Sequence, residues 1–366
     1  MRIAMLSPLF ESVPPRFYGG TERVIFNLSR GLTAAGIDVT LFASGDSVSS
    51  GRLIPVIDEA LRLKKKPVSD PNVYNLKMLA EVAHRADEFD LIHNHHDYWM
   101  LPLSEMISAP LLTTLHGRMD LPDISAAFYS YPKSFYVSIS HSQRVPMSKL
   151  HWLRTIYHGI NVEEFKFQEK PGKYLAFLGR ISREKAPHFA IEIAHRSGVP
   201  LKIAAKIEGP ESQEYFDKCI KPHVDGKFIE FIGEISESEK SDFLGNALAL
   251  VFPIDWPEPF GLVVIEALAC GTPVLARPCG SMPELLSDGV TGFISLDVEV
   301  LAKRVQDIPT ISRRFCREWV EKRFSLKRMT EDYIHVYRHA TSSRFRSDRR
   351  RRNILYPIQR IADGNT

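Results

Sequence analysis

The sequence predicts an α/β fold divided into two domains, on three observations. The chain has 366 residues, more than one hydrophobic core usually supports. Short apolar runs alternate with longer amphipathic stretches, as in parallel sheets with crossover helices. This rhythm stops in a polar segment with Pro and Gly near residues 160–173 and then restarts, so we place the domain boundary there.

The first half opens with an apolar run, RIAMLSP, which predicts a strand. In the next stretch, GGTERVIFNLSRGLTAAG, Val24, Ile25, Leu28 and Leu32 share one helical face, and Gly36 is a stop signal. Further strands are predicted for DVTLFAS, DLIHNHH, PLLTTLHG and SFYVSIS, and TIYHGIN closes this half.

The second half repeats the pattern. Strands are predicted for KYLAFLGR, LKIAAKI, FIEFIGE, LALVFPI and PVLARP, and helices for PHFAIEIAHRSG and GLVVIEALACG. Residues 312–340 are charged and helical in pattern. Residues 342–366 read as a tail with seven Arg against two Asp, so its charge of +5 exceeds the +3 of the whole chain.

The composition is that of a soluble globular protein, with 44% hydrophobic and 25% charged residues. Neither an apolar run long enough to span a membrane nor a signal-peptide core is found, and the four Cys form no CxxC pair. We therefore expect a cytoplasmic protein with reduced thiols. The charge distribution disfavours a nucleic-acid binder, because the excess positive charge lies in the tail.

Three motifs follow strand ends. Gly19 and Gly20, between Tyr18 and Thr21, allow a close backbone approach to a ligand at a helix start, unless they form an ordinary glycine-rich loop. Arg180 and Lys185 flank a turn after KYLAFL, where two cations suit a diphosphate; the alternative is a solvated basic loop.

The third motif contains two carboxylates, Glu258 and Glu266, around the start of an apolar helix predicted for 260–269. Glu258 precedes the helix, where backbone N–H groups converge, and Glu266 lies two turns along inside it. A buried glutamate needs a partner. Either a ribose diol or a buried salt bridge would supply one for Glu266.

This third region resembles the retaining glycosyltransferases of family 4. Those enzymes have the GT-B fold, in which two Rossmann-like, doubly wound domains face each other across a cleft. The matching residues are Glu258, Glu266, Gly271, Thr272, Pro273, Gly280, Pro283, Glu284, Gly289, Gly292 and Phe293. The resemblance extends from Met1 to about residue 340 and includes His116 after PLLTTL. The YGGTERV and FPIDWPEPFGL segments resemble a bacterial subgroup that includes antibiotic-tailoring sugar transferases.

The resemblance implies an acceptor-side domain at 1–165 and a nucleotide-sugar domain at 166–325. A C-terminal helix at 326–341 would return to the first domain, ahead of the basic tail at 342–366. It also implies transfer of a hexose from a nucleotide-sugar, a UDP-sugar or alternatively GDP-mannose. The acceptor would be a glycan, a lipid-linked sugar or a small metabolite.

The resemblance also implies residue roles. Arg180 and Lys185 would hold the diphosphate and Glu266 the ribose. Glu258 and the backbone N–H groups of Phe260, Gly261 and Leu262 would hold the transferred sugar. His116 would lie near that sugar, and Gly20 near the diphosphate. Lys206 and Ile207 would lie near the base, although KIEGP departs from the usual GxGP pattern.

Other clusters leave alternatives. His93, His95, His96 and Asp97 could bind a metal, line the cleft or form a plain loop. We expect no cofactor and no metal, because the chain has no Asp-x-Asp acidic motif. Residues 62–66 and 344–352 are either solvated or contact an anionic membrane. Rival functions are a nucleotide-sugar epimerase and a non-catalytic nucleotide-sugar-binding subunit.

Overall fold

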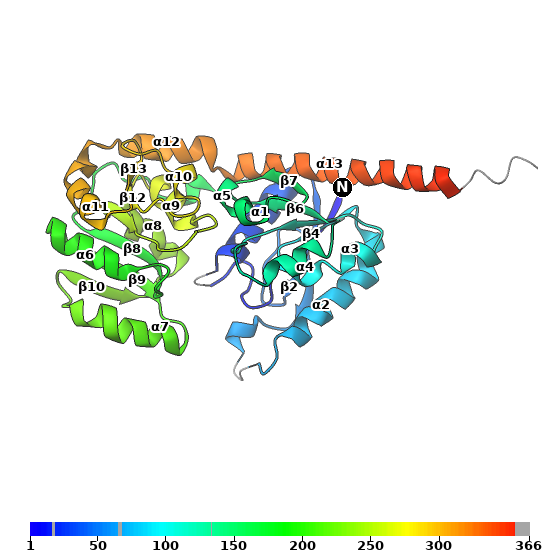
Figure 1. Ribbon diagram of the computed structural model, residues 1–366, viewed down its shortest axis with the longest axis horizontal. Helices are drawn as coiled ribbons and strands as arrows, with labels where there is room; N and C mark the ends of the chain where they lie inside the picture. Colours follow the sequence, from blue (N-terminus) through cyan, green and yellow to red (C-terminus); the bar gives the residue numbers. More distant parts are fainter. Residues whose placement is uncertain (17–18, 65–67, 133, 356–366) are drawn as a thin grey trace, which may run out of the picture.

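The computed structural model describes residues 1–16, 19–64, 68–132 and 134–355, with side chains up to residue 342. Within these residues the chain forms two α/β domains lying side by side (Figure 1). The predicted α/β class and the two-domain organisation are confirmed. In the described part of the chain, no helix is both long and apolar enough to cross a membrane.

The N-terminal domain contains a parallel sheet whose described strands follow the order β3-β2-β1-β4-β5-β6-β7. The strands are β1 (Arg2–Leu6), β2 (Asp38–Ser44), β3 (Arg52–Ile57), β4 (Leu91–Asn94), β5 (Leu111–Thr114), β6 (Phe135–Ser138) and β7 (Trp152–Thr155). The helices are α1 (Gly20–Ala34), α2 (Asn72–Arg85), α3 (Leu103–Met106), α4 (Ile124–Tyr129) and α5 (His141–Arg144). The strand order reverses between β1 and β4, as in doubly wound folds.

The C-terminal domain repeats this plan with the strand order β10-β9-β8-β11-β12-β13 among its described residues. The strands are β8 (Leu175–Arg180), β9 (Leu201–Lys206), β10 (Ile229–Gly233), β11 (Ala249–Phe252), β12 (Val274–Ala276) and β13 (Gly292–Ile294). The helices are α6 (Pro187–Ser197), α7 (Gly209–Tyr215), α8 (Glu237–Gly245), α9 (Leu262–Ala269), α10 (Met282–Leu285), α11 (Val298–Arg304) and α12 (Arg313–Arg323).

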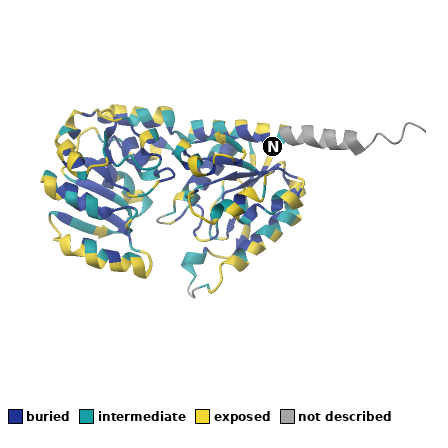
Figure 2. Ribbon diagram, viewed as in Figure 1, coloured by how far each residue is buried: buried dark blue, intermediate teal, exposed yellow. Residues whose placement is uncertain are grey.

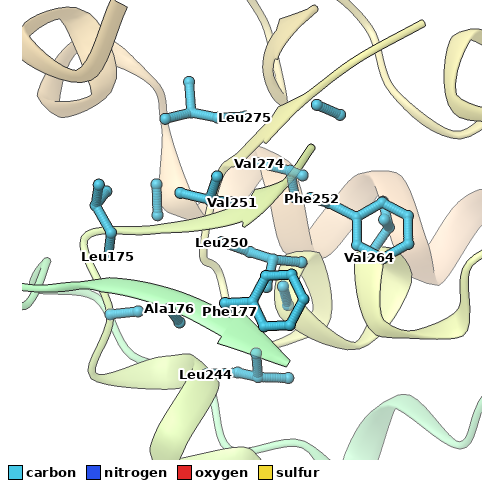
Figure 3. Packing of buried hydrophobic residues seen from close by; sticks show 14 of the residues in the cluster. Leu175, Ala176, Phe177, Leu244, Leu250, Val251, Phe252, Val264, Val274 and Leu275 are labelled. Carbon is cyan, nitrogen blue, oxygen red and sulfur yellow. The ribbon is translucent and has the colours of Figure 1, made fainter. Parts of the chain in front are cut away.

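The central strands are buried because helices cover both faces of each sheet, which explains their continuous apolar runs (Figure 2). Around β8 and β11, Phe177, Leu250 and Phe252 pack with Val264 of α9 (Figure 3). Helix α9 begins at Leu262, two residues later than predicted, since Gly261 takes φ +93° at its N-cap. The predicted strands and helices are all present. The strands β3, β7 and β13 and the helices α2, α3, α4, α5, α7, α8, α10 and α11 were not anticipated.

The last helix, α13 (Leu326–Leu355), leaves the C-terminal domain and runs across the N-terminal one (Figure 1). Met329, Tyr333 and Tyr337 are buried there in the cluster that also contains Val24 and Leu28 of α1. The helix continues beyond residue 341 to Leu355, so the first part of the expected tail is helical. The side chains of 343–355 and all of 356–366 lie outside the described residues.

Candidate active site

A cavity of about 440 Å³ lies between the two domains, lined by residues of both. In the C-terminal domain it touches the ends of β8, β9 and β11, through Arg180, Lys206 and Phe252. In the N-terminal domain it touches His116, shortly after β5. Ligands of doubly wound sheets bind at such carboxyl ends, near the point where the strand order reverses. The cavity is therefore the candidate active site.

Most residues singled out in the sequence meet in this cavity. Its lining includes Gly19, Gly20, His116, Arg180, Lys185, Lys206, Glu258, Phe260, Gly261, Leu262 and Glu266. Ile207 does not line it; its side chain packs against the hydrophobic core of the C-terminal domain. Tyr18 lies outside the described residues.

The Gly19–Gly20 loop brings the start of α1 to the cavity. A Cβ added to Gly19 would lie 2.6 Å from Cβ of Pro15, which real Cβ atoms do not tolerate. A Cβ on Gly20 would come 3.7 Å from Cδ1 of Leu262, in the other domain. Gly19 therefore has no room for a side chain, whereas the distance at Gly20 is an ordinary van der Waals contact and shows that the N-terminal ends of α1 and α9 lie close together.

Lys185 and Glu258 form a buried ion pair in the lining. Nζ of Lys185 lies 2.5 Å from Oε2 of Glu258, and their side chains are 8% and 10% exposed. The indole N–H of Trp256 donates to the same oxygen at 2.7 Å. The turn after β8 returns Lys185 toward the sheet edge, since its backbone N–H donates to the Ser182 hydroxyl at 3.2 Å. The Lys185 ammonium and the Glu258 carboxylate are therefore held side by side in the wall of the cavity.

The loop before α9 is fixed by the segment at residues 280–281. The backbone N–H of Ser281 donates to the Glu258 carbonyl at 2.9 Å, and its hydroxyl donates to the Phe260 carbonyl at 2.5 Å. A Cβ on Gly280 would lie 2.2 Å from the Glu258 carbonyl oxygen. This packing holds Glu258 beside the N-terminus of α9, where backbone N–H groups favour negative charge.

Glu266 is part of an ion-pair chain that crosses between the domains. Its Oε1 lies 3.0 Å from Nζ of Lys240, which also lies 2.9 Å from Glu237. Glu237 lies 3.0 Å from Arg23 of α1. Burial raises the pKa of Glu266, and the Lys240 ammonium opposes this rise. The structure thus contains one of the two interactions that the sequence suggested for Glu266, a buried salt bridge.

The histidine cluster lies beneath the cavity. Nδ1 of His95 is 2.9 Å from Nε2 of His116, and Nδ1 of His93 is 2.7 Å from the Tyr337 hydroxyl of α13. Burial lowers the pKa of His116 to about 3, so its ring is neutral at pH 7. Within the described residues, no group of three or more His, Cys, Asp or Glu side chains could hold a metal ion. His93 belongs to β4, whereas His95 and His96 follow that strand in irregular backbone, and both His93 and His95 are buried.

Several lining residues were missed by sequence reasoning. His158 stacks on His116 with ring centroids 5.3 Å apart and contacts Phe260 at 4.7 Å. Glu22 is 6% exposed, and burial raises its pKa to about 7. Trp256 and Lys240 hold the two glutamates. Trp256 and Glu22 lie beside recognised motifs, but nothing in the sequence marks Lys240 or His158.

Arg62 and Lys206 are engaged in ion pairs. Arg62 lies 2.6 Å from Glu11 and 3.4 Å from Glu234 of the other domain, and its side chain is 21% exposed. Nζ of Lys206 lies 2.8 Å from Glu208. Lys65 and Lys66 lie outside the described residues.

Comparison with known proteins supplies the family. The model described as "Glycosyltransferase Family 4" matches residues 18–164, and the one described as "Glycosyl transferases group 1" matches residues 161–322. A glycogen synthase of Mycobacterium tuberculosis is 25% identical, with 91% of each chain covered.

Two solved structures share the fold. AviGT4, described as a glycosyltransferase involved in avilamycin A biosynthesis, aligns with a TM-score of 0.72 at 21% identity, covering 93% of this chain and 98% of AviGT4. HepE of Anabaena, solved with UDP and glucose, aligns with a TM-score of 0.72 at 18% identity, covering 92% of this chain and 99% of HepE. These similarities confirm the GT-B arrangement of two Rossmann-like domains.

Proposed function

The chain belongs to the glycosyltransferases of group 1 and family 4, and from this premise we propose that it transfers a hexose from a nucleotide-sugar with retention of configuration. The favoured donor is a UDP-sugar, with GDP-mannose as the alternative. The acceptor is a glycan, a lipid-linked sugar or a small metabolite. HepE, which has the same fold, was solved with UDP and glucose, and this supports the choice of UDP.

One observation carries the proposal. A single cavity between the domains brings Arg180 and Lys185 together with Glu258 and the N-terminus of α9. Two cations and a helix N-terminus suit a diphosphate. A carboxylate beside them suits the hydroxyl groups of the attached sugar.

In the proposed reaction the bond between the sugar and the diphosphate breaks, and negative charge grows on the leaving group. Arg180, Lys185 and the backbone near Gly20 stabilise that charge, and losing one such donor typically costs ~2.7–4 kcal/mol. The sugar passes through an oxocarbenium-like state. Glu258 and the backbone N–H groups of Phe260, Gly261 and Leu262 hold its hydroxyls.

Retention is proposed to follow from attack on the same face as the departing phosphate, which accepts the acceptor's proton. His116 would contribute as a neutral hydrogen-bonding group, because burial lowers its pKa to about 3. Glu266 would hold the ribose by sharing its carboxylate between the sugar diol and Lys240, while Lys206 would lie near the base. Closure of the cavity would favour transfer over hydrolysis by excluding water.

The direct test begins with calorimetry, which measures the binding of UDP, GDP and ADP. The protein is then incubated with UDP-glucose or GDP-mannose, and release of the nucleoside diphosphate is measured. Binding of UDP with slow release of UDP from UDP-glucose supports the proposal. Conversion of the sugar without release of UDP would identify an epimerase. Binding with no conversion would identify a non-catalytic subunit.

We also propose that transfer needs no metal ion, since the sequence lacks an Asp-x-Asp motif. The rate of transfer in excess EDTA should differ from the untreated rate by no more than about 20%. Loss of activity on chelation, with recovery on adding manganese or magnesium, would contradict this.

We further propose that the protein acts in the cytoplasm and can contact the inner face of an anionic membrane. Of the two candidate segments, 62–66 is the weaker, because Arg62 is already paired with Glu11 and Glu234. The segment 344–352 follows the part of α13 packed on the N-terminal domain, and its side chains lie outside the described residues.

A further inference from the structure

Glu284 matches a family motif but has no role in the account above. It lies on α10 of the C-terminal domain, and its carboxylate accepts three hydrogen bonds from the N-terminal domain. The backbone N–H groups of His141 and Ser142 donate to Oε2 and Oε1, each at 2.8 Å. The Tyr157 hydroxyl donates to Oε2 at 3.0 Å. Because both oxygens are used, the contact fixes orientation as well as distance.

The partner of Glu284, helix α5, in turn holds the backbone around His116. The side-chain amide of Gln143 donates to the carbonyls of Leu115 and Gly117, at 2.9 and 2.8 Å. Gln143 is 5% exposed, and its amide oxygen accepts from the backbone N–H of Ile139 at 2.9 Å. The residues on either side of His116 are thus tied to the helix that Glu284 contacts.

On its own domain, Glu284 follows the segment that holds the Glu258 loop. Ser281, three residues earlier, bonds the carbonyls of Glu258 and Phe260. Gly280 leaves no room for a side chain against Glu258. A short run of residues, 280–284, therefore reaches Glu258 at one end and α5 at the other.

We propose that Glu284 is a positioning residue that sets His116 of the N-terminal domain relative to Glu258 of the C-terminal domain. The inference rests on the proposed function in one respect, namely that both residues face the transferred sugar. Burial, and then the Glu284 carboxylate, raises the pKa of Tyr157 to about 12, so that the phenol remains a donor at physiological pH. The contact acts through the backbone and touches no substrate.

The test compares Glu284→Gln with a control variant, Glu318→Gln. Glu318 is an exposed residue of α12 whose carboxylate lies 3.9 Å from the guanidinium of Arg314. An amide cannot accept on both sides, so Glu284→Gln should speed hydrogen exchange of the amides at 139–143 and 115–117 at least tenfold. Amides of β8 should be unchanged. Turnover of UDP-glucose should fall at least tenfold, while the dissociation constant for UDP stays within threefold. Glu318→Gln should alter none of these.

A double-mutant cycle with Gln143→Met tests the route to His116. If Glu284 acts through α5, the effects of the two substitutions on turnover overlap, and the double variant loses little more than the worse single one. Additive effects, or unchanged exchange at 115–117 in Glu284→Gln, would overturn the proposal. If Glu284→Gln does not fold, Tyr157→Phe gives the same comparison with one donor removed. A wild-type protein that binds none of UDP, GDP and ADP refutes the proposed function, while the exchange data still decide the role of Glu284.

Discussion

Lys185 and Glu258 are joined by a buried ion pair, with Nζ of the lysine 2.5 Å from Oε2 of the glutamate. Both line the cavity between the domains, and Trp256 donates to the same carboxylate oxygen. The proposed diphosphate side and sugar side of the active site are therefore in direct contact through one pair of charges.

Replacing Lys185 by alanine should abolish transfer and lower the melting temperature while leaving the fold intact. The substitution removes a proposed diphosphate cation and leaves a buried carboxylate without its ammonium partner, which is destabilising. Kinetics and thermal unfolding check this, with Lys202→Ala as control, because Lys202 pairs with Glu230 at 3.5 Å at the outer part of the sheet. Activity of Lys185→Ala within threefold of wild type would refute the assignment.

Glu258→Gln and Glu266→Gln should separate two roles. A sugar contact tightens as the ring flattens, so Glu258→Gln should cut turnover ~10²-fold or more. A ribose contact is made equally before and during reaction, so Glu266→Gln should mainly raise the Michaelis constant.

Calorimetry with UDP alone decides between the two, because UDP carries ribose but no transferred sugar. Glu266→Gln should bind it more weakly, and Glu258→Gln should bind it like wild type. If both variants bind UDP like wild type, Glu266 serves only the ion pair with Lys240. If Glu258→Gln binds more weakly, the roles are reversed.

Glu22 should make the folded protein less stable as the pH rises. Burial raises its pKa from an ordinary 4.5 to about 7. Between these values the folded state binds more protons than the unfolded one, so the free energy of unfolding falls with rising pH. The whole effect is on the order of 3 kcal/mol.

Glu22→Gln should flatten this slope, so that the variant gains melting temperature relative to wild type between pH 5 and 8. The control is Glu81→Gln on α2, at a half-buried carboxylate that pairs with Arg85 at 2.8 Å, and it should leave the slope unchanged. A wild-type melting temperature that climbs across this range with the same slope in Glu22→Gln would show that Glu22 is ionised when folded.

Deleting residues 342–366 should leave the dissociation constant for UDP unchanged. Tyr333 and Tyr337, which attach α13 to the N-terminal domain, precede the deletion. Binding to vesicles containing anionic lipid should fall if the arginine-rich segment contacts the membrane, and this is measured by co-sedimentation. Weaker UDP binding would instead mean that the tail contributes to the cavity.

Much of the site was predictable because its residues follow local rules. Gly19 and Gly20 precede a helix, Arg180 ends a strand, and Glu258 precedes an apolar helix, so each signal lies within a few residues. Ile207 shows where local reasoning stops. Strand β9 ends at Lys206, which lines the cavity, while the next residue is half-buried and packs against the core.

The sequence by itself determined the α/β class, the two-domain division and the motifs that meet in the cavity, because hydrophobic periodicity and turn residues act over short distances. Only the tertiary structure decided the partners of the charged groups. Lys240 reaches Glu266 from a separate helix, and Glu284 reaches α5 from the other domain. A buried carboxylate needs a donor nearby in space, and packing of distant segments decides which donor that is.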